Sequence, residues 1–112
     1  MGTFARGVVV LVRFPFSDLS HSKLRPALVL ADAGRDDYIL CQITSQPYNA
    51  PQAIQLDTAN FAVGSLQRTS FIRGEKLFTA HASLISKEVG QLQQAKLNEV
   101  LTYIVRLFME TS

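Results

Sequence analysis

The 112-residue chain has one cysteine, no tryptophan and only two histidines. The single cysteine, Cys41, excludes an internal disulfide and a zinc site built on several cysteines. Because Cys41 lies within an apolar segment, we interpret it as a small buried hydrophobic residue. An apolar run such as Val8 to Val12 is far shorter than the roughly 20 residues that span a bilayer. We therefore expect no membrane segment. We also expect no metal site and no cofactor.

Charge is also scarce. Charged residues make up 18% of the chain and hydrophobic residues 47%, which is typical of an ordered globular protein. The net charge of +2 permits an anionic partner without requiring one. The length fits one domain over residues 1–112, with a core that needs no disulfides. The first residues lack the pattern of a signal peptide, so we expect a cytoplasmic protein.

Short apolar segments rich in β-branched residues predict β-strands along most of the chain. They cover residues 8–14, 25–31, 38–44, 53–56 and 66–72, with weaker candidates at 78–79 and at 85–92, where Gly90 interrupts. Pro26 fits a strand only near its start or at a sheet edge. Turn-forming residues predict loops at 17–23, 32–37 and 47–51.

The last segment has a different periodicity. Apolar residues recur at three- and four-residue steps from Leu97 to Phe108, which predicts one amphipathic helix. Its start is weakly marked, because Gln93 and Gln94 are poor N-caps. We interpret the apolar stripe as a core-packing face. Many short strands followed by one helix predict a mainly β fold, a small barrel capped by a C-terminal helix.

Two of the predicted strands carry polar groups at one end. Arg25 begins the strand at 25–31, and Thr44 ends the strand at 38–44. If these strands pair antiparallel, Arg25 lies near Thr44, and Ser45 and Gln46 add further donors. A guanidinium beside a hydroxyl is suited to holding a phosphate, because its planar fork binds two oxygens. The alternative is a surface arginine beside a strand end that caps its own backbone.

Five segments, in the same order, resemble the MazF/PemK family of toxin endoribonucleases. They are Arg6 to Val12 with Phe14-Pro15-Phe16, Lys23 to Leu30, Cys41 to Gln46, Gly64 to Leu66, and Ser70 to Arg73 followed by Lys76 to Thr79. The chain departs from the family at Val8, where Asp is usual, and at Gly74-Glu75, where Pro-Asp is frequent. Neither departure touches Arg25 or Thr44, which match the catalytic arginine and threonine of the family.

The resemblance implies an SH3-like barrel (MazF/PemK/CcdB-like) and a homodimer that cleaves single-stranded RNA without a metal. It also implies a cognate antitoxin, and operator DNA as a partner through the antitoxin complex. The 2′-hydroxyl of RNA would attack the adjacent phosphorus, leaving a 2′,3′-cyclic phosphate and a 5′-hydroxyl. Electrostatics and positioning would supply most of the rate. Arg25 would stabilise the developing charge, and Thr44 would bond a phosphate oxygen or the attacking hydroxyl.

Other residues are auxiliary candidates. His21, in the loop before Arg25, has a pKa range suited to general acid or base catalysis, although a lone loop histidine is often idle. Arg73 and Glu75 match the late motif of the family, where RNA contacts and auxiliary proton transfer are placed. Ser45 and Gln46 are expected to contact RNA from the end of their strand.

Aromatic side chains near these loops are candidates for stacking on unpaired bases. The candidates are Phe14, Phe16 and Tyr48, of which Phe16 is equally suited to the core. Two other functions remain open from the sequence. One is a toxin of the same fold that poisons DNA gyrase without enzymatic activity, and the other is an SH3-like module that binds nucleic acid or peptide.

Overall fold

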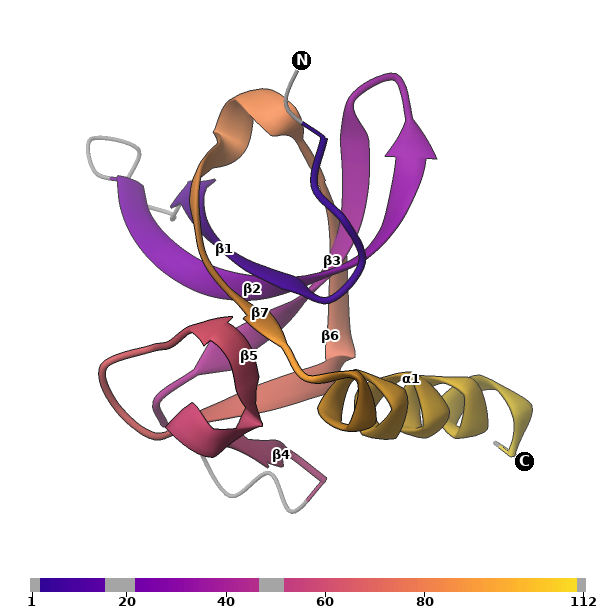
Figure 1. Cartoon of the computed structure of the whole chain (residues 1–112). Coiled ribbons are helices and arrows are strands. Elements are labelled where there is room, and N and C mark those ends of the chain that lie inside the picture. The colour runs from indigo at the N-terminus through magenta and orange to yellow at the C-terminus, as the bar shows by residue number, and fades with distance from the viewer. Residues whose placement is uncertain (1–2, 16–21, 47–51, 111–112) are drawn as a thin grey trace.

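The computed structural model describes residues 3–15, 22–46 and 52–110. Within these ranges, seven strands form one antiparallel sheet that is followed by a helix (Figure 1). The strands are β1 (Val8–Pro15), β2 (Ser22–Gly34), β3 (Asp37–Thr44), β4 (Ile54–Leu56), β5 (Phe61–Gly64), β6 (Ser70–His81) and β7 (Ile85–Leu92), and the helix is α1 (Gln94–Met109). The predicted fold class, mainly β with a C-terminal helix, is confirmed.

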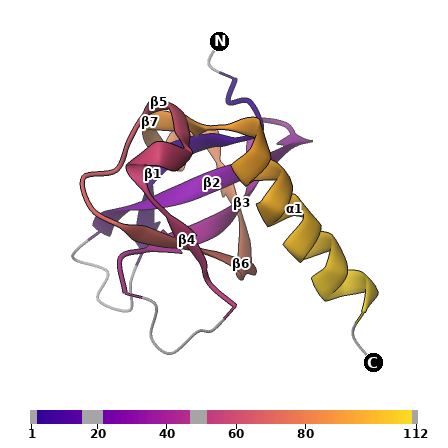
Figure 2. The same cartoon turned by 60° about the horizontal axis from the view of Figure 1, so that its bottom comes forward.

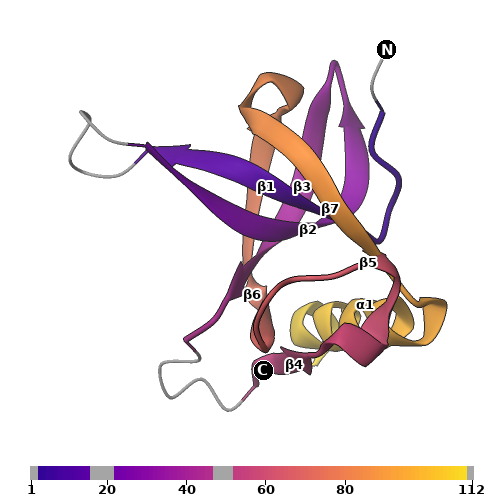
Figure 3. The same cartoon turned by 60° about the vertical axis from the view of Figure 1, so that its left-hand side comes forward.

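The sheet curls into a half-barrel with the strand order β4-β6-β3-β2-β1-β7-β5. Figure 3 shows β1 and β2 running side by side toward one edge of the molecule. Helix α1 crosses one end of the half-barrel and packs on β6. Its C-terminal half extends away from the sheet (Figure 2). Within the described residues, no helix is long and apolar enough to cross a membrane.

The turn between β2 and β3 is tighter than predicted. Only Arg35 and Asp36 separate the strands, and both have positive φ, at 57° and 63°. This conformation matches the two-residue hairpin turns that follow the natural twist of a sheet. The predicted loop at 32–37 is therefore wrong at its start, because β2 continues through Gly34.

Other strand limits also differ. The strand predicted at 66–72 begins only at Ser70, and β6 continues to His81, so the weak candidate at 78–79 belongs to it. Strand β5 was not predicted. Strand β7 runs through Gly90 without a break, with a register shift against β1 beside it. A Cβ on Gly90 would lie 2.7 Å from the Phe61 ring and from the Val63 carbonyl oxygen of β5. Glycine at this position lets β5 approach β7 closely.

Pro26 lies inside a central strand rather than at an edge. It faces Leu11 of β1, while the pairing of β2 with β3 is established from Ala27 onward. Proline has no N–H to donate. Pro26 lies just before the paired part of β2 and β3, so the missing donor falls outside that pairing. This position explains how a proline is accommodated near the start of β2.

Side chains alternate between two buried clusters, one on each face of the sheet. Cys41 is fully buried, as predicted, in the first cluster, which also contains Ile43 of β3 and Leu97 and Val100 of α1. The second cluster, on the opposite face, contains mainly β1 and β2 residues: Val8, Val10, Val12, Ala27, Val29, Tyr38, Leu40, Ala80 and Ile85. The expectation that the helical stripe packs in the core is confirmed for Leu97 but wrong for Phe108, which is 66% exposed.

Candidate functional site

The start of β2 and the end of β3 meet at one groove. The two strands pair antiparallel, with Ala27 opposite Gln42. Arg25 lies two residues before Ala27 in β2, and Thr44 lies two residues after Gln42 in β3, so both stand at the same end of this pairing. Both residues line a groove with a volume of about 660 Å³, which Ser45 and Gln46 line as well. The sheet therefore brings together the four residues that the sequence placed at these two strand ends.

The opposite wall of the groove comes from the connection between β5 and β6. Leu66, Gln67 and Arg68 line it there, Ser70 lines it from the start of β6, and Lys23 lines it from β2. Lys23, Gln67 and Arg68 were not among the expected site residues. Arg68 follows a family-like Gly64-Ser65-Leu66 segment, which was a usable signal. With these residues the groove holds three cations, Lys23, Arg25 and Arg68, and attracts a polyanion.

The Thr44 hydroxyl is fixed by its own chain. It accepts a hydrogen bond from the Gln46 amide at 3.1 Å and lies 3.2 Å from the Gln46 carbonyl oxygen, to which it donates. Thr44 is buried, so its orientation is set before any ligand arrives. This is the local backbone capping that the sequence left open as an alternative. A hydroxyl oxygen has two lone pairs, so a second donor can still be accepted.

Arg73 and Glu75 form an ion pair beside the groove rather than in its lining. The Arg73 Nε and Nη2 atoms lie 3.0 Å and 2.9 Å from the same oxygen, Glu75 Oε2. Arg73 pairs with Gln42, and residues paired across strands share a sheet face. Because Gln42 also pairs with Ala27, Arg73 belongs to the face that carries Arg25.

A bulge in β6 creates this arrangement. One step along β3, from Cys41 to Gln42, corresponds to four steps along β6, from Leu77 to Arg73. Gly74, Glu75 and Lys76 are therefore extra residues in β6. A Cβ on Gly74 would lie 2.8 Å from the Tyr103 ring of α1, so glycine allows the helix to seat here.

The Glu75 carboxylate influences two neighbouring groups. Burial, followed by the charge of Glu75, raises the pKa of the Cys41 thiol to about 12. The same two causes, in the same order, raise the pKa of Tyr103. Cys41 is therefore a protonated, inert thiol at neutral pH rather than a nucleophile.

Several sequence candidates fall elsewhere. His21, Phe16 and Tyr48 lie outside the described residues. The ring of Phe14 packs against that of Phe78, with centroids 5.0 Å apart. Among the described residues, no three His, Cys, Asp or Glu side chains gather closely enough to hold a metal ion. The groove offers cations and hydrogen-bonding groups, which can stabilise phosphate charge.

Comparisons with known proteins agree with this fold. The MazE–MazF complex (Form II) from Deinococcus radiodurans has a TM-score of 0.74 at 19% identity, covering 94% of this chain and 95% of that chain. An endoribonuclease in complex with its cognate antitoxin from a mycobacterial species has a TM-score of 0.69 at 13% identity, covering 100% and 98%. Mycobacterium tuberculosis toxin MazF-mt6 has a TM-score of 0.69 at 14% identity, covering 94% of this chain and 98% of that chain.

No curated protein matches the chain significantly in sequence. The model of one family, described as PemK-like, MazF-like toxin of type II toxin-antitoxin system, matches residues 5–108. This match covers nearly the whole chain and includes every strand and most of α1. The chain therefore belongs to the PemK-like, MazF-like toxins of type II toxin–antitoxin systems.

Proposed function

We propose that this toxin is a sequence-specific endoribonuclease that cleaves single-stranded RNA without a metal ion. The observation that carries the proposal is the meeting of Arg25 and Thr44 in one groove with two further cations, Lys23 and Arg68. Structural neighbours described as endoribonucleases support it, although at 13–16% identity they share the fold and little sequence. Cytoplasmic location, where mRNA is found, is part of the same proposal.

The reaction needs three things from the protein. The 2′-hydroxyl must approach the phosphorus in line with the leaving 5′-oxygen, the phosphorane must be stabilised, and protons must move between the two oxygens. The Arg25 guanidinium is suited to the second task, because its fork meets two phosphate oxygens and it keeps its charge. Lys23 and Arg68 are placed to hold neighbouring phosphates, which fixes the backbone for in-line attack.

Thr44 has a more limited role in this proposal. Its hydroxyl is held by Gln46 and accepts a further hydrogen bond, for example from the 2′-hydroxyl that attacks. The attacking hydroxyl loses its proton and the 5′-oxygen gains one, so the overall transfer balances. The products are a 2′,3′-cyclic phosphate and a 5′-hydroxyl. His21 stays a candidate for one of the proton transfers.

The test is purified protein on single-stranded RNA, with EDTA in one arm and Mg²⁺ in the other. We expect equal rates in both arms and fragments that end in a 2′,3′-cyclic phosphate. A folded Arg25→Ala protein serves as the control for a contaminating ribonuclease. Fragments with a 3′-hydroxyl, or activity abolished by EDTA, would contradict the mechanism. The gyrase-poisoning and binding-module alternatives both predict no cleavage at all.

We further propose that a cognate antitoxin inhibits the protein by covering the groove, and that the complex binds operator DNA. Two structural neighbours were determined with their antitoxins. The three groove cations suit an acidic, extended segment that orders on binding. Such a peptide should compete with RNA, and its competition should weaken as salt rises. An inhibitor that left RNA binding unchanged would contradict this account.

A further inference from the structure

A second, smaller hollow of about 220 Å³ lies apart from the cationic groove. Phe14 of β1, Gln42 of β3, and Lys76, Leu77 and Phe78 of β6 line it. Its lining shares no residue with that of the groove. The residues come from three strands, so their relative positions are fixed by the sheet. We call this hollow the aromatic pocket.

The aromatic pocket lies on the face of the sheet that carries Arg25. Gln42 pairs with Ala27 and with Arg73, and these three residues therefore share a face. Arg25 is two residues from Ala27 and lies on that face as well. Lys23, which lines the groove, is the direct partner of Phe14, which lines the pocket. The two sites are thus adjacent where Phe14 of β1 pairs with Lys23 of β2.

The chemistry of the aromatic pocket fits a flat heterocycle. Phe14 and Phe78 are partly buried, and their rings are 5.0 Å apart and inclined by 56°. Partly exposed aromatic rings are the surfaces on which unpaired bases stack. The partly buried Gln42 amide carries both donors and an acceptor, which is what the edge of a base requires.

The bulge in β6 adds a charge at the same place. Gly74, Glu75 and Lys76 are the extra residues of the bulge, and Lys76 lines the pocket with an exposed side chain. Bulges beside functional sites commonly redirect a side chain in this way. Arg73 lies on the other side of the bulge, where Glu75 holds it. Lys76 therefore supplies a cation at the pocket itself, as expected for a site that receives one nucleotide of a polyanion.

We propose that the aromatic pocket binds one nucleobase of the RNA, that of a nucleotide next to the cleaved phosphate, and sets the sequence preference at that position. The proposal rests on the proposed ribonuclease function. Phe14 and Phe78 supply the stacking surface, Gln42 reads the base edge, and Lys76 holds the adjoining phosphate or a carbonyl of the base. These residues determine specificity and position, while the reacting atoms stay in the groove.

The experiment uses single-stranded RNA of mixed sequence and a set of oligonucleotides with one abasic nucleotide at each position around the cut. The variants are Gln42→Ala, Lys76→Ala and Phe78→Leu, with melting temperatures as a folding check. Lys87→Ala is the matched control, because Lys87 is an exposed lysine of β7 outside both sites. Lys76→Ala removes an exposed side chain, so it remains informative if the partly buried variants unfold.

We expect wild-type kcat/KM to fall about tenfold or more when the abasic nucleotide occupies one particular position. Gln42→Ala and Lys76→Ala should lose preference at that position only, and should be insensitive to the abasic substitution there. Lys87→Ala should behave like wild type. Unchanged preference in all three variants, with cleavage intact, would overturn the pocket proposal and leave the ribonuclease function standing.

A binding measurement separates the two proposals if the wild-type protein does not cleave RNA. Fluorescence anisotropy with a labelled single-stranded RNA of about ten nucleotides reports binding without chemistry. The expected result is that RNA binds wild type and Lys87→Ala equally well, and binds Lys76→Ala and Phe78→Leu several-fold more weakly. This result would support base binding in the aromatic pocket even though the cleavage proposal fails. Equal binding to all four proteins, or no binding to wild type, would overturn the pocket assignment.

Discussion

Glu75 holds Arg73 through one carboxylate oxygen. The Oε2 atom accepts hydrogen bonds from Arg73 Nε and Nη2 at 3.0 Å and 2.9 Å. The other oxygen, Oε1, is buried and has no hydrogen-bond partner in the part of the chain that the structure describes. A carboxylate already engaged with an arginine is poorly placed to act as a base. We therefore infer that Glu75 positions Arg73, in contrast to the proton-transfer role that the family resemblance implies.

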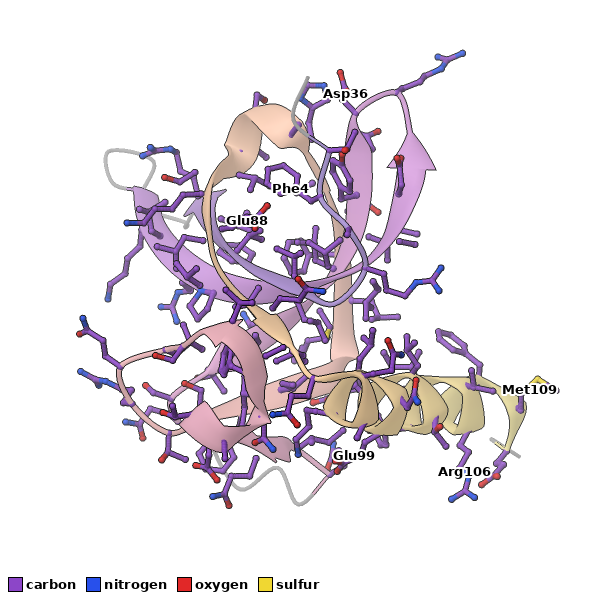
Figure 4. The ribbon with its side chains drawn as sticks, viewed as in Figure 1. Phe4, Asp36, Glu88, Glu99, Arg106 and Met109 are labelled. Atoms are coloured by element: carbon purple, nitrogen blue, oxygen red, sulfur yellow. The ribbon has the colours of Figure 1, made fainter. Side chains whose placement is uncertain are left out.

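Replacing Glu75 with glutamine should lower kcat/KM about tenfold, or about 1.4 kcal/mol, because Arg73 loses a charged acceptor. The shape of the pH–rate profile should stay the same. Loss of one limb of the profile would instead assign proton transfer to Glu75. Glu99→Gln is the matched control, because Glu99 is an exposed residue of α1 that bonds Lys96 at 3.0 Å; Figure 4 shows Glu99 on the helix.

Arg25→Ala should cost about 2–4 kcal/mol in the barrier, the usual effect of deleting one transition-state donor. Arg25→Lys should be impaired less severely, because lysine keeps the charge but lacks the planar fork. Single-turnover cleavage of one defined RNA by folded variants measures both effects. Wild-type rates in Arg25→Ala would favour the interpretation of the protein as a binding module.

Thr44→Val keeps the shape of the side chain but removes the hydroxyl that bonds Gln46. We expect a loss of about 1 kcal/mol in stability and a much larger loss, roughly 100-fold, in kcat. Thr44→Ser should recover most of both. A Thr44→Val protein with lower stability but a normal kcat would show that the hydroxyl only shapes the end of β3.

The raised pKa of Cys41 predicts how stability changes at alkaline pH. The thiol ionises near 9.0 in the unfolded chain and at about 12 in the folded protein. Below pH 9 the thiol is protonated in both states, so its contribution to stability is fully present. Between pH 9 and 12 the thiol loses its proton in the unfolded chain but keeps it in the folded protein. The free energy of unfolding should therefore fall as pH rises through this range.

Urea unfolding at several pH values measures this effect. Cys41→Ala should make the decline shallower, while the raised pKa of Tyr103 leaves part of it in place. Thiol labelling of the native protein at pH 8 should proceed only as fast as the protein opens, because Cys41 is fully buried. Rapid labelling under native conditions would contradict the assigned burial.

The features that could be predicted from the sequence have strong local signals. The valine-rich β1, the hydrophobic period of α1 and the neighbouring strand ends at Arg25 and Thr44 are examples, because each depends on a short pattern. The site residues that were missed depend on the fold. Arg68 reaches the groove only because the connection between β5 and β6 lies against the ends of β2 and β3. The β6 bulge contains Gly74, where a Cβ would lie 2.8 Å from the Tyr103 ring of α1, and this long-range contact is not contained in local propensity.

The free half of α1 predicts how the protein assembles. Val105, Phe108 and Met109 are 58%, 66% and 77% exposed, and Figure 4 shows Met109 and Arg106 at the end of the helix that projects from the sheet. Neighbouring apolar side chains exposed in this way are usually covered in an assembly. We therefore predict a homodimer in which α1 contributes to the interface.

Light scattering of the wild-type protein at micromolar concentration should give twice the 12.4 kDa mass of one chain. Phe108→Glu and Met109→Glu should shift the mass toward that of a monomer, because a charge at a buried interface is costly. Asn98→Glu adds the same charge to an exposed position near the start of α1 and should leave the dimer intact. A monomeric wild-type protein would refute the dimer, whereas a dimer that survives both apolar substitutions would place its interface away from the projecting end of α1.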